Sequence, residues 1–360
     1  MRIAFVSDAV YPYHKGGKEI RLFEIATRLA KRGHDIHIYT MKWWTGANVI
    51  QEHGVTLHGI SPVYPLYTSK GKRSIKQSLL FPLYILPCLI KEDFDILDVD
   101  QMPYFPVFPS WLVSRIKRKR MIVTWHEKWG SYWFKYLGIV GLFGYLVEKC
   151  TEALSKRVIV VSQLTADRLA KKRQTLIPNG IDLEEIKAVA PSKEQYDLIY
   201  AGRLIDHKNI DLLIRVANKN NYKTLITGTG PAEKKLQKIA KNNVHFLGAL
   251  KDHKEVFSYM KSSKVFVALS EREGFGISVL ESLGCGTPVV TSNHKDNAGK
   301  ALIKSGYNGC ISLLTEADVE RAIEYCMKHN AEMRAHAIAS AEKYDWNAIV
   351  DKIEEVYLHE

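Results

Sequence analysis

The feature that most constrains the fold is the order of elements at the start of the chain: an apolar strand, a glycine-containing turn, an amphipathic helix and a second apolar strand. Residues 3–8 predict the first strand, residues 18–32 the helix and residues 35–40 the second strand. Gly33 follows the helix as a carboxyl-terminal cap. Because two strands joined by a helix run parallel, this order predicts a doubly wound α/β domain.

Further strands are expected in two series. The first series falls at 55–60, 95–99, 121–125 and 157–162, and the second at 197–201, 223–227, 244–247, 264–268 and 288–291. Pro178, Asn179, Gly180 and a charged stretch reaching Pro191 lie between the series and predict a linker. Since 360 residues exceed what a single core usually holds, we expect two α/β domains, at 1–178 and 195–343, with the boundary at 178–195.

Cysteine content and charge indicate the compartment and the partners. The five cysteines form no CxxC pair, which predicts free thiols in a reducing compartment, and the first apolar run meets Asp8 too early for a signal peptide. We therefore expect a cytoplasmic protein. A formal net charge of +12 favours anionic partners, namely nucleic acid, acidic lipid headgroups or phosphorylated substrates. Composition alone does not choose among these partners.

Two aromatic and apolar stretches, at 79–90 and 129–147, interrupt the regular pattern. The first is short and contains two prolines, and Lys135 interrupts the second, so neither predicts a membrane span. Basic residues lie beside them: Lys70, Lys72, Arg73, Lys76, Arg115, Lys117, Arg118, Lys119 and Arg120. Two interpretations stay open: contact with an anionic membrane surface, on the inner face of the cytoplasmic membrane, or core helices with a solvated charged flank.

The segment from 271 to 290 carries the clearest chemical signal. Glu273 precedes a Gly274-Phe275-Gly276 turn, and Glu281 lies in the short helix expected after it. Free backbone N–H groups at the start of such a helix favour a bound phosphate. Carboxylates on either side accept hydrogen bonds from the hydroxyl pairs of a sugar or a ribose.

This segment, with its Gly-x-Pro-Val-Val exit strand, resembles the Glu-x7-Glu signature of glycosyltransferase family 4 (group 1), a family of retaining enzymes. The resemblance implies the GT-B fold, in which two Rossmann-like domains face each other across a cleft and a final helix, here within 344–360, crosses back to the first domain. It also implies a nucleotide-sugar donor, UDP- or GDP-linked, bound by the second domain, and an acceptor bound by the first.

Other residues match the family's motifs at their places in this sequence. The resemblance assigns Arg203 and Lys208 to the donor diphosphate, Glu273 to the sugar, Glu281 to the ribose and His126 to the reacting centre. It assigns the close approaches to the donor to Gly16, Gly17, Gly202, Gly228, Gly274, Phe275 and Gly276. No residue stands out as a covalent nucleophile, which suits transfer on the donor's own face with the leaving phosphate helping to deprotonate the acceptor.

Asp98-Val99-Asp100 has the Asp-x-Asp pattern that can hold a hard cation. The pattern is short and lies far in sequence from the donor motifs, so we expect no required metal or other cofactor. An acceptor contact is the alternative role for this pair.

Other classes of protein stay open at this point. A nucleotide-sugar 2-epimerase shares the architecture, and a non-catalytic binder of anionic lipid or nucleic acid would explain the charge but not the donor motifs. For the transferase we expect a lipid, lipid-linked or glycan acceptor, with the lipid-linked kind favoured by the aromatic and basic first domain, and no nucleic acid partner.

Overall fold

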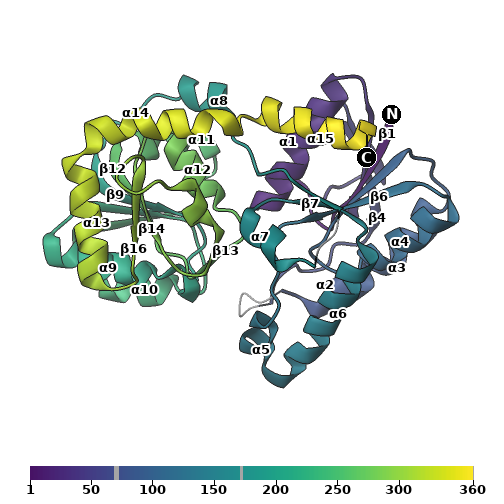
Figure 1. The fold of residues 1–360 in the computed structure, drawn as a ribbon, viewed down its shortest axis with the longest axis horizontal. Helices are drawn as coiled ribbons and strands as arrows, with labels where there is room; N and C mark the ends of the chain where they lie inside the picture. The colour runs from purple at the N-terminus through teal and green to yellow at the C-terminus, as the bar shows by residue number, and fades with distance from the viewer. Residues whose placement is uncertain (69–72, 171–172, 360) are drawn as a thin grey trace. The chain divides into compact units, whose positions relative to one another are not determined.

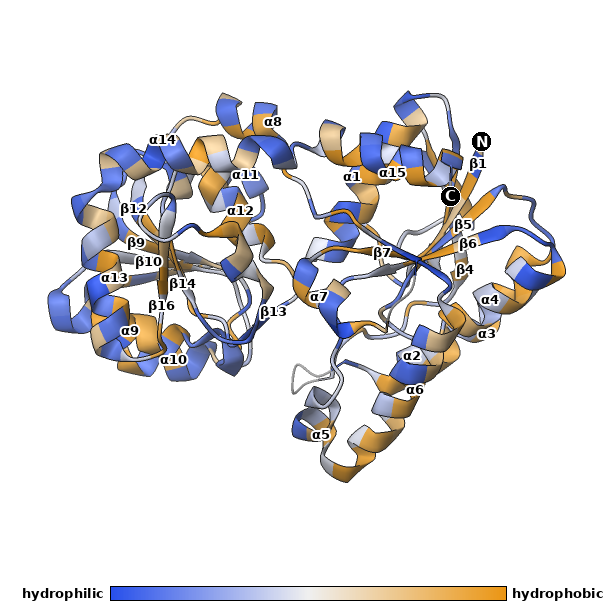
Figure 2. Cartoon of the chain, viewed as in Figure 1, coloured by the Kyte–Doolittle hydropathy of each residue, from blue (hydrophilic) through white to orange (hydrophobic). Residues whose placement is uncertain are grey.

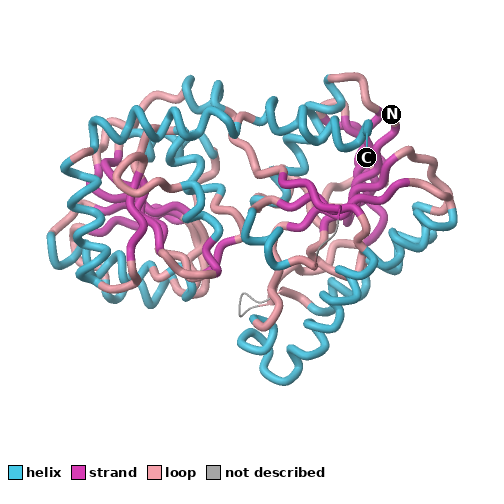
Figure 3. Tube along the Cα trace, viewed as in Figure 1, coloured by secondary structure: helices cyan, strands magenta, loops and turns pink. Residues whose placement is uncertain are grey.

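The computed structural model describes residues 1–68, 73–170 and 173–359, and the chain divides into two compact units (Figure 1). The first unit comprises Met1–Asn179 and Trp346–Glu360, and the second comprises Gly180–Asp345. Each unit has a largely parallel sheet with helices on both faces (Figure 3). Lys70 and Lys72, two of the basic residues noted beside the first apolar stretch, lie outside the described residues.

The sheet of the first unit has the strand order β3-β4-β2-β1-β5-β6-β7-β8 within the described residues. All neighbours run parallel except β3 and β4. The bounds are β1 Arg2–Val6, β2 Asp35–Met41, β3 Val49–Glu52, β4 Val55–Ser61, β5 Ile96–Asp100, β6 Arg120–Trp125, β7 Arg157–Val160 and β8 Arg173–Leu176. The strand order reverses at β1, between β2 and β5, and the carboxyl ends of strands at such a point are where open α/β sheets bind ligands.

Helices cover both faces of this sheet because successive β1 residues point to opposite sides, and Ile3, Ala4, Phe5 and Val6 are all apolar and buried. Ile3 and Phe5 join the core beneath one helical layer, and Ala4 and Val6 join the core beneath the other. The helices are α1 Gly17–Lys31, α2 Ile75–Leu80, α3 Pro82–Leu89, α4 Val107–Ile116, α5 Tyr132–Leu137, α6 Gly141–Leu154, α7 Gln163–Arg168 and α15 Trp346–His359.

Helix α15 returns from the end of the chain to complete the first unit, as the family resemblance implies. Its buried residues Trp346, Ile349 and Ile353 pack in the same core as α1. The Tyr357 hydroxyl donates a hydrogen bond of 2.5 Å to Oδ2 of Asp98 in β5. Helix α15, fourteen residues long, is thus part of the first core rather than an appendage.

The second unit has the strand order β11-β10-β9-β12-β14-β16, with every pair parallel. Its strands are β9 Tyr196–Ala201, β10 Thr224–Thr227, β11 Val244–Gly248, β12 Ser263–Ala268, β14 Val289–Ser292 and β16 Gly309–Ser312, with a small pair formed by β13 Arg272–Glu273 and β15 Asp296–Asn297. Its helices are α8 Leu183–Ala188, α9 Ile210–Asn220, α10 Glu233–Ile239, α11 His253–Lys261, α12 Ile277–Gly284, α13 Glu316–Lys328 and α14 Asn330–Ala341. Here the order reverses at β9, which lies between β10 and β12.

The stretch expected as a linker contains a helix instead. Asp182 caps α8 by accepting a hydrogen bond from the Glu185 N–H, and Leu183 and Ile186 are buried. They pack where α12 presents Gly284, whose missing side chain makes room for them. The charged residues and the prolines of this stretch favoured a linker, because only two apolar residues, Leu183 and Ile186, indicate the buried face of the helix.

Replacing Tyr357 with Phe is expected to destabilise the first unit, because buried Asp98 loses one of its two hydroxyl donors. Burial raises the pKa of Asp98 to about 6, so the carboxyl is charged in the folded protein at pH 8 and mostly neutral at pH 5. The loss in free energy of unfolding should be about 1–3 kcal/mol at pH 8 and smaller at pH 5.

Urea unfolding followed by tryptophan fluorescence measures this, since all seven tryptophans lie in the first unit. The exposed Tyr325 of α13 provides the matched control, Tyr325→Phe. A loss of equal size at both pH values would contradict the role given to the ionised Asp98.

Candidate functional site

In the second unit, Glu273 and Lys208 form an ion pair at the carboxyl edge of the sheet. Lys208 ends a short 3-10 turn after β9, and its ammonium donates to Oε2 of Glu273, the last residue of β13. Burial alone would raise the pKa of Glu273, but the charge of Lys208, with smaller effects of His207 and Arg203, holds that pKa below its usual range. Glu273 is therefore an anion held by the charge of Lys208, with Arg203 as a further cation nearby.

Two glycine turns meet beside this pair. A side chain at Gly228, which has a φ of +118°, would overlap the carbonyl oxygen of Gly202, which follows β9. The Gly202 N–H donates to the Thr227 carbonyl at 3.1 Å, so the ends of β9 and β10 are joined directly. Only glycine permits this approach, and it leaves an edge made of backbone where a ligand can come close.

Helix α12 begins after the third glycine turn. Gly276 is its N-cap residue with a φ of +94°, and Phe275 before it is buried. The first N–H groups of α12 have no acceptor within the helix, which favours an anion at this end. Glu281, in the second turn of α12, is buried and lies 2.8 Å from Nε2 of His253 in α11.

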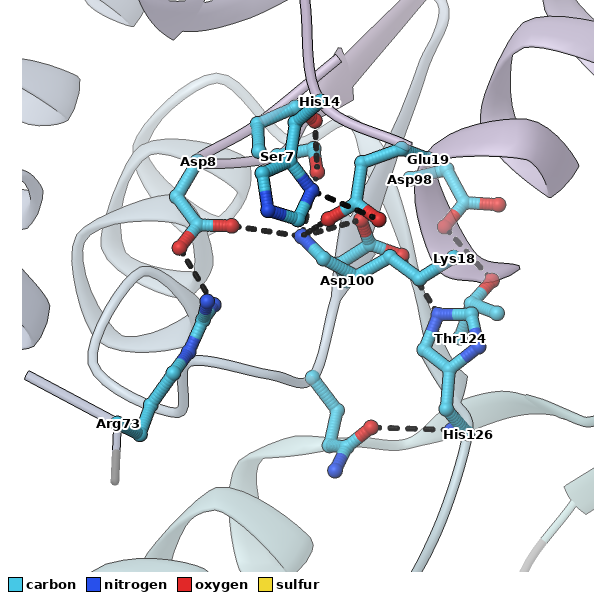
Figure 4. Close-up of polar contacts among 12 residues, drawn as sticks. Ser7, Asp8, His14, Lys18, Glu19, Arg73, Asp98, Asp100, Thr124 and His126 are labelled. Atoms are coloured by element: carbon cyan, nitrogen blue, oxygen red, sulfur yellow. Dashed lines mark hydrogen bonds and ion pairs between the residues drawn. The ribbon is translucent and has the colours of Figure 1, made fainter. Parts of the chain in front are cut away.

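In the first unit, His126 follows β6 directly and is held on two sides (Figure 4). Its backbone N–H donates to Oε1 of Gln101 at 3.0 Å, and its ring nitrogen Nε2 lies 2.8 Å from Oδ1 of Asp100. Gly16 is the N-cap residue of α1 and Gly17 its first residue, after the carboxyl end of β1. A side chain at Gly16 would overlap the carboxylate of Glu19.

The two carboxylates of the Asp-x-Asp pattern have separate partners. Asp98 accepts hydrogen bonds from Thr124 and Tyr357, whereas Asp100 contacts Lys18 and His126. Among the residues that the structure describes, no group of three or more His, Cys, Asp or Glu side chains is placed to hold a metal ion. The two carboxylates therefore do not act as one unit.

Sequence reasoning did not select Asp8, Lys18, Arg73 or His253. Asp8 and Lys18 stand beside recognised features, the end of the first strand and the Gly16-Gly17 turn, but no pattern showed that Lys18 would be nearly buried between Asp8 and Asp100. Arg73, which binds Asp8 at 2.6 Å, is 65 residues away from it in the chain. Only the fold brings these residues together.

Comparison with known proteins gives matches along almost the whole chain. Residues 182–357 match the model described as glycosyl transferases group 1, and residues 15–185 match that of glycosyltransferase family 4. The gpi3 subunit of phosphatidylinositol N-acetylglucosaminyltransferase from Schizosaccharomyces pombe is 25% identical over 307 residues, which are 80% of this chain and 65% of that protein. This chain thus spans just under two thirds of that relative.

Solved structures share the whole fold at low sequence identity. Sucrose-phosphate synthase from Thermosynechococcus elongatus superposes with a TM-score of 0.84 at 18% identity, covering 99% of this chain and 98% of that one. HepE of Anabaena, in complex with UDP and glucose, superposes with a TM-score of 0.76 at 18% identity and covers all of both chains.

The fold and these matches define a glycosyltransferase enzyme of the GT-B type, which confirms the fold class expected from the sequence. The chain belongs to the group 1 glycosyltransferases of family 4. Within the described ranges, none of its helices combines the length and the apolar character needed to cross a bilayer.

Replacing Lys208 with Met is expected to destabilise the second unit by about 1–3 kcal/mol at pH 7, because Glu273 stays charged without its partner. The folded pKa of Glu273 is lowered, so the pair stabilises the protein above the unfolded pKa of about 4.3, and this stabilisation is lost as the pH falls through the folded value. The double variant Lys208→Met/Glu273→Gln should recover part of the loss.

Circular dichroism measures this unfolding, with tryptophan fluorescence as a separate report on the first unit. The exposed Lys235 of α10 gives the control Lys235→Met. An unfolding curve of Lys208→Met equal to that of the control would show that the pair contributes nothing.

Proposed function

We propose that the protein is a retaining glycosyltransferase that moves a sugar from a UDP- or GDP-sugar to a hydroxyl of a lipid or lipid-linked acceptor. The observation that carries the proposal is the ion pair of Lys208 and Glu273 beside the touching glycine turns of the second unit. A carboxylate that stays ionised can orient sugar hydroxyls, and cations beside it can take a diphosphate.

The donor roles follow from these positions. Lys208 and Arg203 would neutralise the charge that builds on the nucleotide as the glycosidic bond breaks, and Glu273 would hold the sugar. Glu281 would take the ribose hydroxyls in place of its contact with His253. The backbone around Gly202, Gly228 and 274–276 would lie against the phosphates. The UDP bound by the structurally similar HepE supports a donor of this class.

The first unit would bind the acceptor and complete the reacting centre. We assign acceptor binding to residues 1–178 with the final helix, and donor binding to residues 195–343. Gly16 and Gly17 would approach the diphosphate at the amino end of α1, and His126 would position the reacting sugar. Transfer on the donor's own face, with the leaving phosphate accepting the acceptor's proton, requires no protein nucleophile and no metal.

Nucleotide release measured with UDP-, GDP- and ADP-sugars, each with and without a total lipid extract, should identify one donor and rise with lipid. Glu273→Ala should lower the rate by about 100-fold or more, since it removes a group that contacts the reacting sugar. The matched control is Glu233→Ala, at the start of α10.

The anomeric configuration of the product, read by NMR, decides whether the enzyme retains or inverts. Inversion would overturn the retaining assignment. Conversion of the donor sugar without any acceptor would instead favour the 2-epimerase.

A helical hairpin of the first unit supports the membrane part of the proposal. It consists of α5, a short turn at Gly138–Val140, and α6, and it extends away from the sheet of its own unit (Figures 1 and 2). Its tip exposes 89% of Ile139 and 56% of Phe143, with Val140, Leu142 and Leu146 also exposed. A contiguous exposed apolar surface is typical of an interaction site.

The base of this hairpin is fixed to the rest of the first unit by hydrogen bonds. Glu148 of α6 is buried and accepts hydrogen bonds of 2.7 Å from the N–H groups of Trp129 and Gly130 and from the Tyr104 hydroxyl. Exposed Lys135 and Lys149 flank the apolar tip. Apolar insertion beside cationic contacts is how peripheral proteins bind anionic bilayers, and the S. pombe relative is named for transfer to phosphatidylinositol.

The protein should sediment with vesicles containing phosphatidylglycerol, and the double variant Ile139→Asp/Phe143→Asp should lower the bound fraction by about tenfold, because two apolar groups no longer enter the bilayer. Leu313→Asp, at an exposed leucine of the second unit, is the control. Equal loss in both variants, or binding that neither variant changes, would contradict docking through the hairpin.

A further inference from the structure

Alternating charges link Arg73 to His126 through the first unit (Figure 4). Arg73 donates to Oδ2 of Asp8 at 2.6 Å, and the Lys18 ammonium donates to Oδ1 of Asp8 at 2.6 Å. Lys18 also reaches Oδ2 of Asp100 at 3.4 Å, and Oδ1 of Asp100 lies 2.8 Å from Nε2 of His126. Asp8 follows β1, Lys18 lies in α1 and Asp100 ends β5. His126 follows β6 and Arg73 precedes α2, so the fold itself assembles this series.

Lys18 fixes the orientation of Asp100. Its three N–H donors have three close acceptors, the Ser7 hydroxyl at 2.8 Å and one oxygen each of Asp8 and Asp100. Because Lys18 occupies Oδ2 of Asp100, the other oxygen, Oδ1, is the one that meets the imidazole. Asp8 is fully buried, and its remaining oxygen is taken by Arg73, so Lys18 has no easy alternative position.

Asp100 remains ionised in this setting. Burial alone would raise its pKa, but Lys18, His126 and Ser7 together hold that pKa far below its usual range. Asp98, the nearest other carboxylate along the strand, is directed to Thr124 and Tyr357, and Glu19 lies 3.7 Å from the same lysine. An ionised carboxylate cannot donate a hydrogen, so the hydrogen between Asp100 and His126 belongs to Nε2.

The second ring nitrogen of His126 is left without a partner. Nδ1 forms no hydrogen bond with any described residue, and the side chain is 17% exposed. With the hydrogen on Nε2, the neutral ring presents a lone pair at Nδ1. A hydroxyl can donate a hydrogen bond to Nδ1 in this tautomer. In the opposite tautomer Nδ1 carries the hydrogen and could not accept that bond.

We propose that Asp100, oriented by Lys18, is a positioning residue that keeps the neutral His126 ring in the tautomer with hydrogen on Nε2, so that Nδ1 accepts a hydrogen bond from a substrate hydroxyl. The tautomer follows from the geometry alone, and its use in the reaction rests on the role of His126 in the proposed function. Asp100 thereby has a role that involves neither a metal nor direct contact with the acceptor.

Nitrogen-15 NMR of the histidine rings tests the tautomer on the whole protein without any substrate. His126→Asn assigns the signal by its disappearance. At a pH where the ring is neutral, we expect Nε2 protonated and Nδ1 unprotonated in the wild type. In Asp100→Asn the amide can donate to Nε2 and should move the hydrogen to Nδ1, whereas the control Asp98→Asn should leave the His126 signal unchanged.

Kinetics test the use of this tautomer. Asp100→Asn should lower kcat by about tenfold or more with the donor KM changed less than about threefold, since the corresponding change in a serine protease triad preserves geometry and acts through the wrong tautomer. Lys18→Met should lower kcat in the same direction, because Asp100 loses the contact that orients it.

Each outcome is decisive. A wild-type ring with hydrogen on Nδ1, or a tautomer that Asp100→Asn does not change, would overturn the positioning role. A changed tautomer with unchanged kcat would overturn its use in catalysis. If the wild type turned over no donor, the proposed function would fail while the NMR result still decided the tautomer.

Discussion

The burial of the last helix against the first sheet is the constraint on which the first unit depends. Helix α15 supplies Trp346, Ile349 and Ile353 to a core that the first 179 residues share with it. Its Tyr357 hydroxyl reaches Asp98 inside that core. A buried carboxyl that lacks donors is costly. Thr124 of β6 provides one donor to Asp98, and the second arrives only when the end of the chain has returned to the sheet. Since Asp98 lies in β5, the same contact holds the strand whose last residue is Asp100.

Two carboxylates on this strand have opposite electrostatic settings. They are two residues apart and therefore lie on the same face of the sheet, where α1 and α15 pack. Asp98 has neutral hydroxyl partners, and burial raises its pKa to about 6, whereas Asp100 has Lys18 and a pKa far below its usual range. Carboxylates whose surroundings separate their pKa values in this way usually have different tasks. Asp98 joins the final helix to the sheet, and Asp100 holds His126.

The sequence predicted the parts of this molecule that local patterns encode. Strand and helix periodicity predicted two parallel α/β units, and the resemblance of the segment with Glu273, the Gly274-Phe275-Gly276 turn and Glu281 to the family signature indicated the family; both are confirmed. The roles of the site residues and the division of donor and acceptor between the domains stay predictions. The buried contacts of Lys18 and Arg73 could not be predicted from the sequence. Their shared partner Asp8 is 10 and 65 residues away along the chain, and lysine and arginine side chains are ordinarily solvated.

The lysine–carboxylate pairs of the two units differ in what a ligand can change. Among the described residues Lys208 has one close carboxylate, Glu273, and in the proposed function a diphosphate beside Arg203 would compete for that lysine and free Glu273 for the sugar. Lys18 has three acceptors and two of them are carboxylates, so an incoming anion would have to displace contacts that no other described cation could replace at both Asp8 and Asp100. In the proposed function the pair of the second unit would rearrange when the donor binds, whereas the geometry of the pair in the first unit is set in advance. In the proposed transfer a new donor enters the second unit at each turnover, while the orientation of His126 that would align the reacting hydroxyl stays fixed.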